Sequence, residues 1–138
     1  MTSSAPGIEL LLDTNIIIYL THGDQTVARF MDERSDMLFA VSALSYLETL
    51  MGIGGPEEEE VLDAVLKPFV IIPVTATIAR TTANALRTRE KRSVRDPLFA
   101  DAIIANTALE LGVPLVTNNP KDFGKFKGLK ILTPKQLH

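Results

Sequence analysis

The 138-residue chain contains no cysteine and only two histidines, which removes several kinds of active site from consideration. Without cysteine there is no disulfide framework, no thiolate nucleophile and no zinc–thiolate site, and this composition suits a reducing cytosol. His22 and His138 are peripheral and too few for a histidine-based zinc centre. These absences exclude thiol and zinc chemistry as the basis of an active site.

Sequence signals for export, membrane insertion and nucleotide binding are also missing. Residues 1–7 contain no basic residue and no long apolar segment, so they do not form a signal peptide, and no apolar run is long enough to span a membrane. Walker, G-x-S-x-G and G-x-G-x-x-G motifs are absent. With 46% hydrophobic and 22% charged residues, the composition is that of an ordinary soluble protein. We expect one domain over residues 1–138, located in the cytoplasm and without membrane contact.

Charge is unevenly distributed along the chain, although the net charge is only −3. Residues 1–79 carry three basic and twelve acidic side chains, whereas residues 80–138 carry eleven basic and five acidic ones. The basic half offers a patch for phosphate groups if its charges share one face of the fold. The alternative is that the two halves simply compensate each other, and the two interpretations carry equal weight.

Short apolar segments alternate with segments of helical periodicity. The expected strands are 8–12, 37–41, 70–73, 115–117 and 129–132, and the expected helices are 16–20, 26–34, 43–53, 57–67, 75–90 and 98–111. Strands that alternate with helices favour a parallel sheet covered by helices on both faces. We therefore predict an α/β fold, a three-layer α/β/α arrangement with a central, mostly parallel sheet.

Asp13 lies between an apolar strand and an apolar helix, in the segment Leu10–Leu20. This position is the carboxyl end of the strand, and in open α/β sheets ligands bind in the crevice outside the strand ends. Aspartate is also a favoured N-cap residue, and for Asp13 considered alone the capping role is favoured over the catalytic one. The catalytic role gains weight only if further acidic residues meet Asp13.

Glu48 and Asp101 are two further carboxylates in largely apolar helices. Glu48 stands three residues after Ser45, the spacing of a capping box, but Ser42 directly follows a strand and is the better N-cap, so Glu48 is expected in mid-helix. Asp101 has apolar residues one helical turn away on both sides, so its carboxylate is expected to be covered. Burying an unpaired carboxylate costs several kcal/mol unless the group is protonated or lies beside a cation. A buried arginine is the alternative partner.

Asp13, Glu48 and Asp101 come from three remote segments and form the oxygen-rich set that a hard divalent cation prefers. Mg²⁺ usually keeps several waters and binds through few carboxylates together with phosphate oxygens. Metal-dependent phosphoryl chemistry is therefore the leading class of function. A phosphatase is less well supported, because Asp13-Thr14-Asn15 lacks the second acid of a D-x-D nucleophile motif.

Four segments resemble, in order and spacing, the motifs of PIN-domain ribonucleases, in particular the VapC-type toxins of toxin–antitoxin pairs. They are residues 11–15 with Asp13, residues 42–51 with Glu48, residues 99–110 with Asp101, and residues 115–123 with Thr117, Asn119 and Asp122. Each motif is weak by itself, but four in register are fairly specific and cover essentially the whole chain. The resemblance implies an α/β/α fold whose strand ends gather the three acids.

The resemblance also implies roles for individual residues. Asp13, Glu48 and Asp101 are the implied ligands of Mg²⁺ or Mn²⁺. Asn119 stands where many relatives have a fourth acid, so it is counted with the catalytic residues although it brings no charge. Four further residues are expected to surround the site, order its loop or orient waters, namely Thr14, Asn15, Thr117 and Asp122.

The implied activity is metal-dependent endonucleolytic cleavage of structured RNA, in which a metal-activated water attacks the phosphorus and leaves 5′-phosphate and 3′-hydroxyl ends. Basic side chains at the end of the 75–90 helix and in a later loop are candidate contacts to the RNA backbone, namely Arg87, Arg89, Lys91, Arg92, Arg95 and Lys121. A solvated helix end and loop explain these residues about equally well. No aromatic residue lies among them, so base stacking there is not indicated.

An antitoxin protein that silences the site and a homodimer are the implied protein partners. Apolar helix surface near Phe30 or Tyr46 is a candidate contact for either partner, although a core role is favoured for both residues. Two alternative functions stay open: a catalytically inactive PIN-like module that binds RNA or acts as a scaffold, and a housekeeping RNA-processing nuclease. Metal-dependent RNA cleavage tests the first alternative, and a neighbouring antitoxin gene tests the second.

Overall fold

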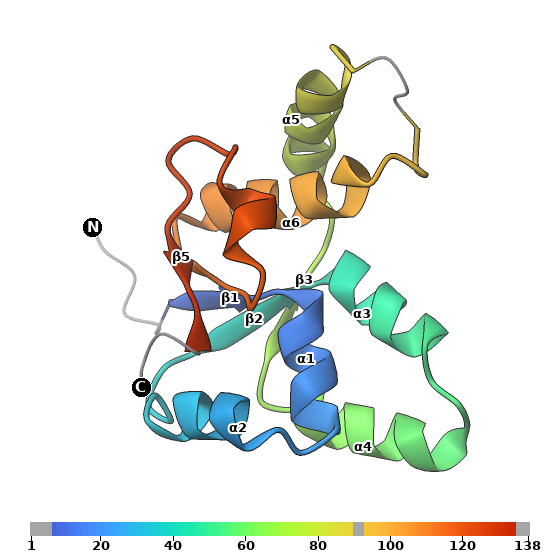
Figure 1. Ribbon diagram of the computed structural model, residues 1–138, viewed down its shortest axis with the longest axis vertical. Coiled ribbons are helices and arrows are strands. Elements are labelled where there is room, and N and C mark those ends of the chain that lie inside the picture. The colour runs from blue at the N-terminus through green and yellow to red at the C-terminus, as the bar shows by residue number, and fades with distance from the viewer. Residues whose placement is uncertain (1–6, 90–92, 135–138) are drawn as a thin grey trace.

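The computed structural model describes residues 7–89 and 93–134, and a sheet of five parallel strands lies at its centre (Figure 1). The strands are β1 (Leu10–Leu12), β2 (Phe39–Ser42), β3 (Val70–Ile72), β4 (Leu115–Val116) and β5 (Ile131–Leu132). Their order in the sheet is β3-β2-β1-β4-β5. The predicted α/β fold with a parallel sheet is confirmed.

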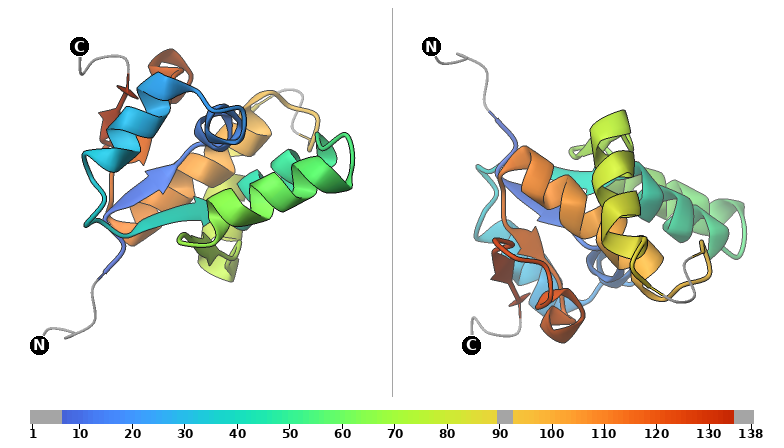
Figure 2. Two further views of the ribbon diagram at one scale, coloured as in Figure 1. Left: turned by 90° about the horizontal axis from the view of Figure 1, so that it is seen from below. Right: turned by 90° about the horizontal axis from the view of Figure 1, so that it is seen from above.

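The described helices cover both faces of this sheet. They are α1 (Thr14–Thr21), α2 (Gln25–Asp32), α3 (Ala43–Met51), α4 (Pro56–Leu66), α5 (Ala76–Leu86), α6 (Leu98–Leu111) and the 3₁₀-helix η1 (Pro120–Phe123). Helices α1, α2 and α4 lie on one face, and α6 lies on the other with α5 packed against it (Figures 1 and 2). None of these helices is both long enough and apolar enough to cross a membrane.

The apolar sequence of β1 explains why both faces are covered. Leu10 and Leu12 pack into the core formed with α1, α2 and α4, whereas Leu11 packs into the core formed with α6. Because successive side chains of a strand point to opposite faces, a strand that is apolar throughout is stable only between two layers. The same alternation continues in β2, where Val41 and Ala40 belong to the first and second core respectively.

Polar residues at the strand ends begin the following helices. Asp13 caps α1 by accepting a hydrogen bond from the backbone N–H of Thr14, and Ser42 caps α3 by accepting one from Leu44. The prediction that Ser42 begins this helix is therefore confirmed, and Glu48 lies in the middle of α3 rather than in a capping box. The carboxylate of Glu48 therefore does not cap the start of α3.

The strand order places a topological switch point between β1 and β4. From β1 the chain builds outward through β2 and β3, and it later returns to the other side of β1 to add β4 and β5. The backbone N–H of Asp13 donates to the carbonyl of Val116 at 2.9 Å, so Asp13 and Thr117 follow neighbouring strand ends. This is the location at which open α/β sheets bind ligands.

Candidate active site

Asp13 is buried at the switch point, and both of its carboxylate oxygens accept hydrogen bonds. Oδ1 accepts from the backbone N–H of Thr14 at 2.7 Å, and Oδ2 accepts from the hydroxyl of Thr117 at 2.7 Å. Thr117 is itself fully buried, and its Oγ1 accepts from the backbone N–H of Asn119 at 3.0 Å. Asp13 therefore caps α1 with one carboxylate oxygen and contacts the end of β4 through Thr117 with the other, so capping does not use the whole carboxylate.

Glu48 is joined to Asp13 through a single residue, Thr14. The hydroxyl of Thr14 lies 2.7 Å from Glu48 Oε1 and 2.9 Å from the hydroxyl of Ser45, while its backbone N–H binds Asp13. The contact to Ser45 was not predicted, because the Ser45–Glu48 spacing was considered only as a capping box. That spacing of three residues already placed both side chains on one face of the helix.

Asp101 completes the acidic set from the first turn of α6. Burial raises the pKa of its carboxyl to about 6, the charges of Asp13 and Asp122 contribute to the rise, and the charge of Lys125 opposes it. Burial also raises the pKa of Asp13; hydrogen bonds from Thr117 and Thr14 counteract this effect, and the charges of Glu48 and Asp122 add to it. The acids are thus close enough to repel one another.

These carboxylates gather without forming a closed ligand cage. Among residues 7–89 and 93–134, no group of three or more acidic or histidine side chains is placed to hold a metal ion together. Within the same ranges no arginine forms an ion pair with Asp13, Glu48 or Asp101, since the recorded pairs join Arg34 to Glu33 and Arg89 to Asp96. A buried arginine therefore does not account for the acids.

The donor set fits a hard divalent cation that keeps much of its water. All the candidate ligands are carboxylate or amide oxygens, which Mg²⁺ and Mn²⁺ prefer. Next to Thr14, the Oδ1 atom of Asn15 is buried and has no hydrogen-bond partner among the described residues. A buried amide oxygen without a donor is uncommon, and it adds an acceptor at the start of α1. An open site with few direct protein ligands is the usual arrangement for Mg²⁺.

The loop that follows β4 brings further charge to the site. Asp122 lies in η1 and is exposed, yet its charge acts on both Asp13 and Asp101. Asn119 contributes its backbone N–H to Thr117, and its residue surface is exposed. Lys125, whose charge acts on Asp101, was not predicted. No sequence motif marks Lys125, because only the packing of η1 against α6 brings this loop beside the acids.

The predicted RNA-contacting residues differ in their surroundings. Arg89 forms an ion pair of 2.5 Å with Asp96, a buried acid that also accepts a hydrogen bond from the backbone N–H of Leu98. The remaining described candidates, Arg87, Arg95 and Lys121, are exposed. Lys91 and Arg92 lie outside the described residues. Arg89 is therefore engaged in joining the end of α5 to the start of α6.

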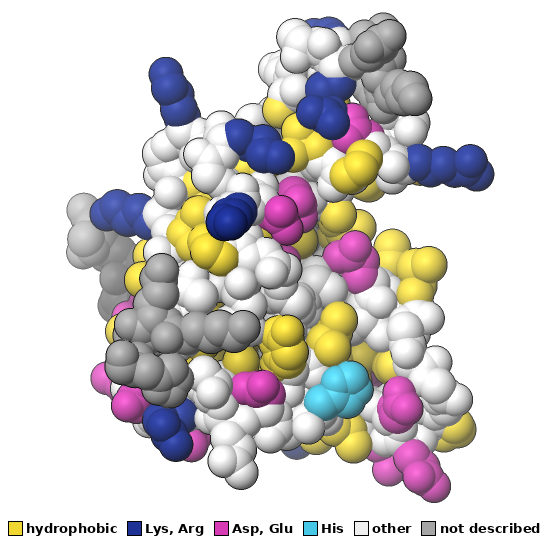
Figure 3. Space-filling model, viewed as in Figure 1, with side chains coloured by type: hydrophobic (Ala, Val, Ile, Leu, Met, Phe, Trp, Pro, Cys, Tyr) yellow, Lys and Arg dark blue, Asp and Glu magenta, His cyan; other side chains and the backbone are white. Residues whose placement is uncertain are grey.

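Basic side chains are more frequent in the upper part of the face drawn in Figure 3 than in its middle and lower parts. In Figure 3, Lys and Arg side chains lie mostly in the upper part of the view, where Figure 1 shows α5, α6 and the loop after β4. Acidic side chains lie in the middle of this face and around α4 at its lower right. These basic side chains stand apart from one another on this face, so the view does not decide between a shared patch and simple compensation.

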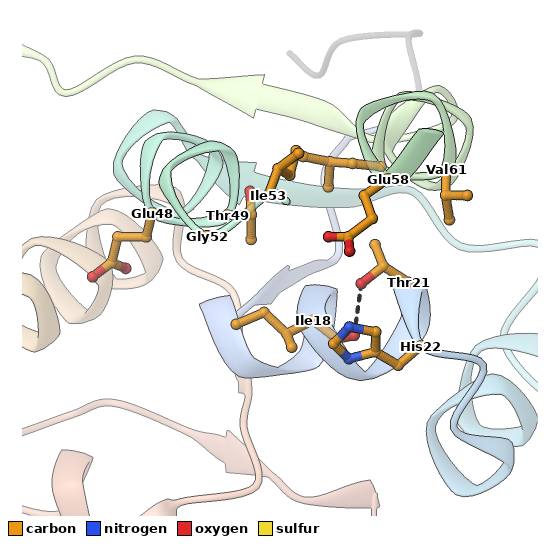
Figure 4. A pocket seen from close by; sticks show the side chains of 10 residues that line it. Ile18, Thr21, His22, Glu48, Thr49, Gly52, Ile53, Glu58 and Val61 are labelled. Atoms are coloured by element: carbon orange, nitrogen blue, oxygen red, sulfur yellow. Dashed lines mark hydrogen bonds between the residues drawn. The ribbon is translucent and has the colours of Figure 1, made fainter. Parts of the chain in front are cut away.

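A pocket of about 160 Å³ adjoins Glu48 between α1, α3 and α4. Its lining includes the apolar side chains of Ile18, Ile53 and Val61. Figure 4 shows Glu48 at one end of the pocket and Glu58 at the other. The pocket is therefore an apolar cavity with an acidic group at each end, and one of these groups belongs to the candidate active site.

The two apolar residues considered as partner contacts belong to the core. Phe30 is buried, and Tyr46 packs against the same hydrophobic cluster. The favoured core role is confirmed for both. Exposed apolar side chains occur elsewhere on α3, at Leu47 and Met51, which are 51% and 78% exposed.

The sequence matches the PIN domain over residues 10–129. The chain belongs to the PIN-domain family. Ribonuclease VapC1 of Rickettsia felis is 28% identical to this PIN domain over 131 residues, which cover 90% of this chain and 95% of the relative.

Solved structures of toxin–antitoxin complexes share the fold of this PIN domain. A toxin–antitoxin complex from Klebsiella pneumoniae contains a chain with 26% identity and a TM-score of 0.71, covering 91% of this chain and 98% of that one. DNA-bound VapBC from Salmonella typhimurium contains a chain with 20% identity and a TM-score of 0.75, covering 92% and 98% respectively. The PIN domain is thus a distant homologue of VapC ribonuclease toxins.

Proposed function

We propose that this PIN domain is a metal-dependent endoribonuclease that hydrolyses RNA phosphodiester bonds and acts in the cytoplasm as the toxin of a toxin–antitoxin pair. The observation that supports the proposal is that Thr14 links Asp13 to Glu48 and that the charges of both acids act on Asp101, with no arginine paired to these acids among the described residues. Burial and neighbouring negative charges raise the pKa values of Asp13 and Asp101, and a divalent cation favours the ionised form of both. The distant homology to ribonuclease VapC1 supports RNA as the substrate.

In this proposal Asp13, Glu48 and Asp101 would hold Mg²⁺ or Mn²⁺, and the bound cation would lower the pKa of a water and neutralise charge on the phosphate. Thr117 and Thr14 hold one oxygen each of Asp13 and Glu48 by direct hydrogen bonds, so the carboxylates keep a fixed orientation. Three peripheral residues have supporting roles: Asn119 and Asn15 orient waters through their amide groups, and Asp122 adds negative charge beside the site.

The RNA backbone is proposed to approach across α5, α6 and the loop after β4. Arg87, Arg95 and Lys121 are exposed on this side, and Lys125 lies near Asp101. Phosphate contacts of this kind give affinity that falls steeply with salt. The opposite approach, across α4, is disfavoured because the first turn of that helix carries Glu57, Glu58 and Glu59.

An antitoxin is the proposed protein partner, and the pocket beside Glu48 is its proposed contact. The apolar walls of the pocket suit an aliphatic stem, and the carboxylates of Glu48 and Glu58 suit a cationic side chain at either end. Occupation of this pocket would place a positive charge beside Glu48 and compete with the metal. A homodimer is also proposed, and exposed Leu47 and Met51 on α3 offer apolar surface for such a contact.

RNA cleavage with and without metal tests the enzymatic function. We expect the purified protein to cleave a structured RNA only after Mg²⁺ or Mn²⁺ is added, to leave 5′-phosphate ends, and to lose this activity in Asp13→Asn and Asp101→Asn. Glu57→Gln, which removes an exposed acid of α4, is the control and should retain activity. Mn²⁺ should also raise the melting temperature of the wild type, because it binds the folded state preferentially.

Three outcomes separate the alternatives. Cleavage that persists in EDTA or in both site variants would contradict the proposed site. Metal-independent RNA binding without cleavage would favour the inactive RNA-binding module. Cleavage by a protein whose gene has no neighbouring antitoxin gene would favour a housekeeping RNA-processing nuclease.

A further inference from the structure

Ser45 lies one helical turn before Glu48 on α3 and is fully buried. Its hydroxyl oxygen is 2.9 Å from the hydroxyl oxygen of Thr14, which in turn is 2.7 Å from Glu48 Oε1. Residues three apart on a helix share a face, so Ser45 and Glu48 both reach Thr14 from the same side. The three side chains form a continuous hydrogen-bonded chain that ends on a carboxylate of the proposed active site.

The available hydrogens determine the direction of this chain. An ionised carboxylate can only accept hydrogen bonds, and the Thr14 hydroxyl has a single hydrogen. That hydrogen therefore points to Glu48 Oε1. Ser45 must then donate its own hydrogen to Thr14 Oγ1, and within the described residues this is the only contact recorded for the Ser45 hydroxyl.

We propose that Ser45 is a positioning residue of the metal site that acts through Thr14 on Glu48, an inference that rests on the proposed function. By filling the acceptor side of the Thr14 hydroxyl, Ser45 keeps this hydroxyl oriented as a donor to Oε1. No donor among the described residues is recorded on the other oxygen of Glu48, Oε2, which stays available to a cation. Second-shell hydrogen bonds of this kind commonly determine how well a carboxylate binds metal.

Asp13 is held by a chain of the same form. The backbone N–H of Asn119 donates to Thr117 Oγ1, and the Thr117 hydroxyl donates to Asp13 Oδ2. In both cases a threonine hydroxyl binds the carboxylate, and a second donor fixes the threonine. For Asp13 that second donor is a backbone group, whereas for Glu48 it is the side chain of Ser45, so only in the Glu48 chain can the second donor be removed by substitution.

A matched control lies on the same helix. Thr49 is also buried, but its hydroxyl shares its one hydrogen between the backbone carbonyls of Tyr46 at 2.8 Å and Ser45 at 3.1 Å, and these described contacts do not include the Glu48 carboxylate. A purely structural role for Ser45 predicts that Ser45→Ala and Thr49→Val lower the melting temperature without changing metal affinity. A positioning role predicts that only Ser45→Ala changes metal affinity.

The test is a calorimetric titration of the full chain with Mn²⁺ in the absence of RNA. We expect Ser45→Ala to weaken Mn²⁺ binding about tenfold and Thr14→Val to weaken it at least as much, as for other outer-shell partners. Ser45→Cys, which nearly keeps the volume but donates weakly, should weaken binding in the same direction. Thr14→Ser keeps the hydroxyl and should bind Mn²⁺ like the wild type, as should Thr49→Val.

The double variant Ser45→Ala/Thr14→Val decides whether Ser45 acts through Thr14. Removing Ser45 after Thr14 has lost its hydroxyl should cause no further loss of affinity, because the chain is already broken. Equal losses in both backgrounds, or unchanged affinity in Ser45→Ala and Ser45→Cys, would overturn the inference alone. A wild-type protein that binds no Mn²⁺ would overturn the proposed function and this inference with it.

Discussion

The hydroxyl of Thr117 donates a 2.7 Å hydrogen bond to Asp13 Oδ2 and so joins two residues that are 104 positions apart. Both residues are buried, and they follow the adjacent strands β1 and β4. Burial alone raises the pKa of Asp13, whereas the Thr117 hydrogen bond lowers it. The contact therefore joins the two strand ends at the switch point and favours the ionised form of Asp13.

Replacing Thr117 by valine tests this double role. Thr117→Val preserves the shape but leaves a buried carboxylate oxygen without its donor, which should lower the free energy of unfolding by about 1–3 kcal/mol at neutral pH without metal. The pKa of Asp13 should rise further. Urea denaturation measures the first effect, and the pH dependence of Mn²⁺ binding measures the second.

Thr117→Ser is the matched control, because it retains the hydroxyl and loses only a methyl group. It should bind Mn²⁺ with the pH dependence of the wild type. If Thr117→Val and Thr117→Ser were equally destabilised and showed the same metal affinity, the methyl group rather than the hydroxyl would be the important contact.

The raised pKa of Asp101 predicts that the free energy of unfolding of the metal-free protein falls as pH rises. Burial raises the pKa of this carboxyl from 3.8 to about 6, so the folded state favours the protonated form. The resulting stabilisation is fully present below pH 3.8 and is lost as pH rises through about 6. The rise corresponds to at most about 3 kcal/mol, and solvent at this partly exposed group reduces the expected effect to about 1 kcal/mol.

Asp101→Asn removes this titration. Compared with the wild type in EDTA, the variant should therefore become relatively more stable between pH 4 and pH 7, an interval that spans the rise of the pKa from 3.8 to about 6. Denaturant unfolding at both pH values measures the difference. A gap that is constant with pH, or one that shrinks on going to pH 7, would show that the Asp101 carboxylate is not destabilising in the folded state.

Because Arg89 forms an ion pair with the buried Asp96, we expect Arg89 to contribute to the stability of the fold. Arg89 lowers the pKa of Asp96, so the stabilisation is present above the ordinary pKa of aspartate and is lost as pH falls. Asp96→Ala should lower the melting temperature more than Arg89→Met, because it also removes the hydrogen bond to the backbone N–H of Leu98. Arg95→Ala should leave the melting temperature unchanged and weaken only RNA binding. Equal melting temperatures for all three variants would contradict this assignment.

The parallel sheet and the elements that carry the acids could be predicted because they depend on local patterns. The apolar run before Asp13, the capping position of Ser42 and the buried helix around Asp101 each identify an element by its own residues, and parallel strands bring their carboxyl ends to one edge. Strand lengths were overestimated. The helix expected over 75–90 ends at Leu86, where Arg87 is the C-cap residue and Arg89 turns toward Asp96.

The side-chain contacts between different helices and loops could not be predicted in the same way. Thr14 and Ser45 come from different helices, and their hydrogen bond depends on how α1 packs against α3. Lys125 lies beside Asp101 only because η1 folds back onto α6. Such contacts depend on side-chain directions across a packed interface, which composition, periodicity and spacing do not specify.

Lys125 is the basic residue whose removal should affect both the acids and the RNA. Its charge lowers the pKa of Asp101, so Lys125→Met should raise that pKa above about 6. Because Asp101 must be ionised to bind metal, the acid limb of metal-dependent cleavage should move to higher pH. Loss of one phosphate contact should also reduce the slope of log affinity against log salt concentration by about one.

Lys127→Met is the control on the same exposed loop, since Lys127 is not among the main charges that act on the pKa of Asp101. This variant should keep the pH profile of the wild type even if it loses some RNA affinity. A shifted acid limb in Lys125→Met but not in Lys127→Met, measured at constant ionic strength, identifies a local effect on Asp101. Identical shifts in both variants would instead indicate a general change in surface charge, and then Lys125 would have no specific place beside the acids.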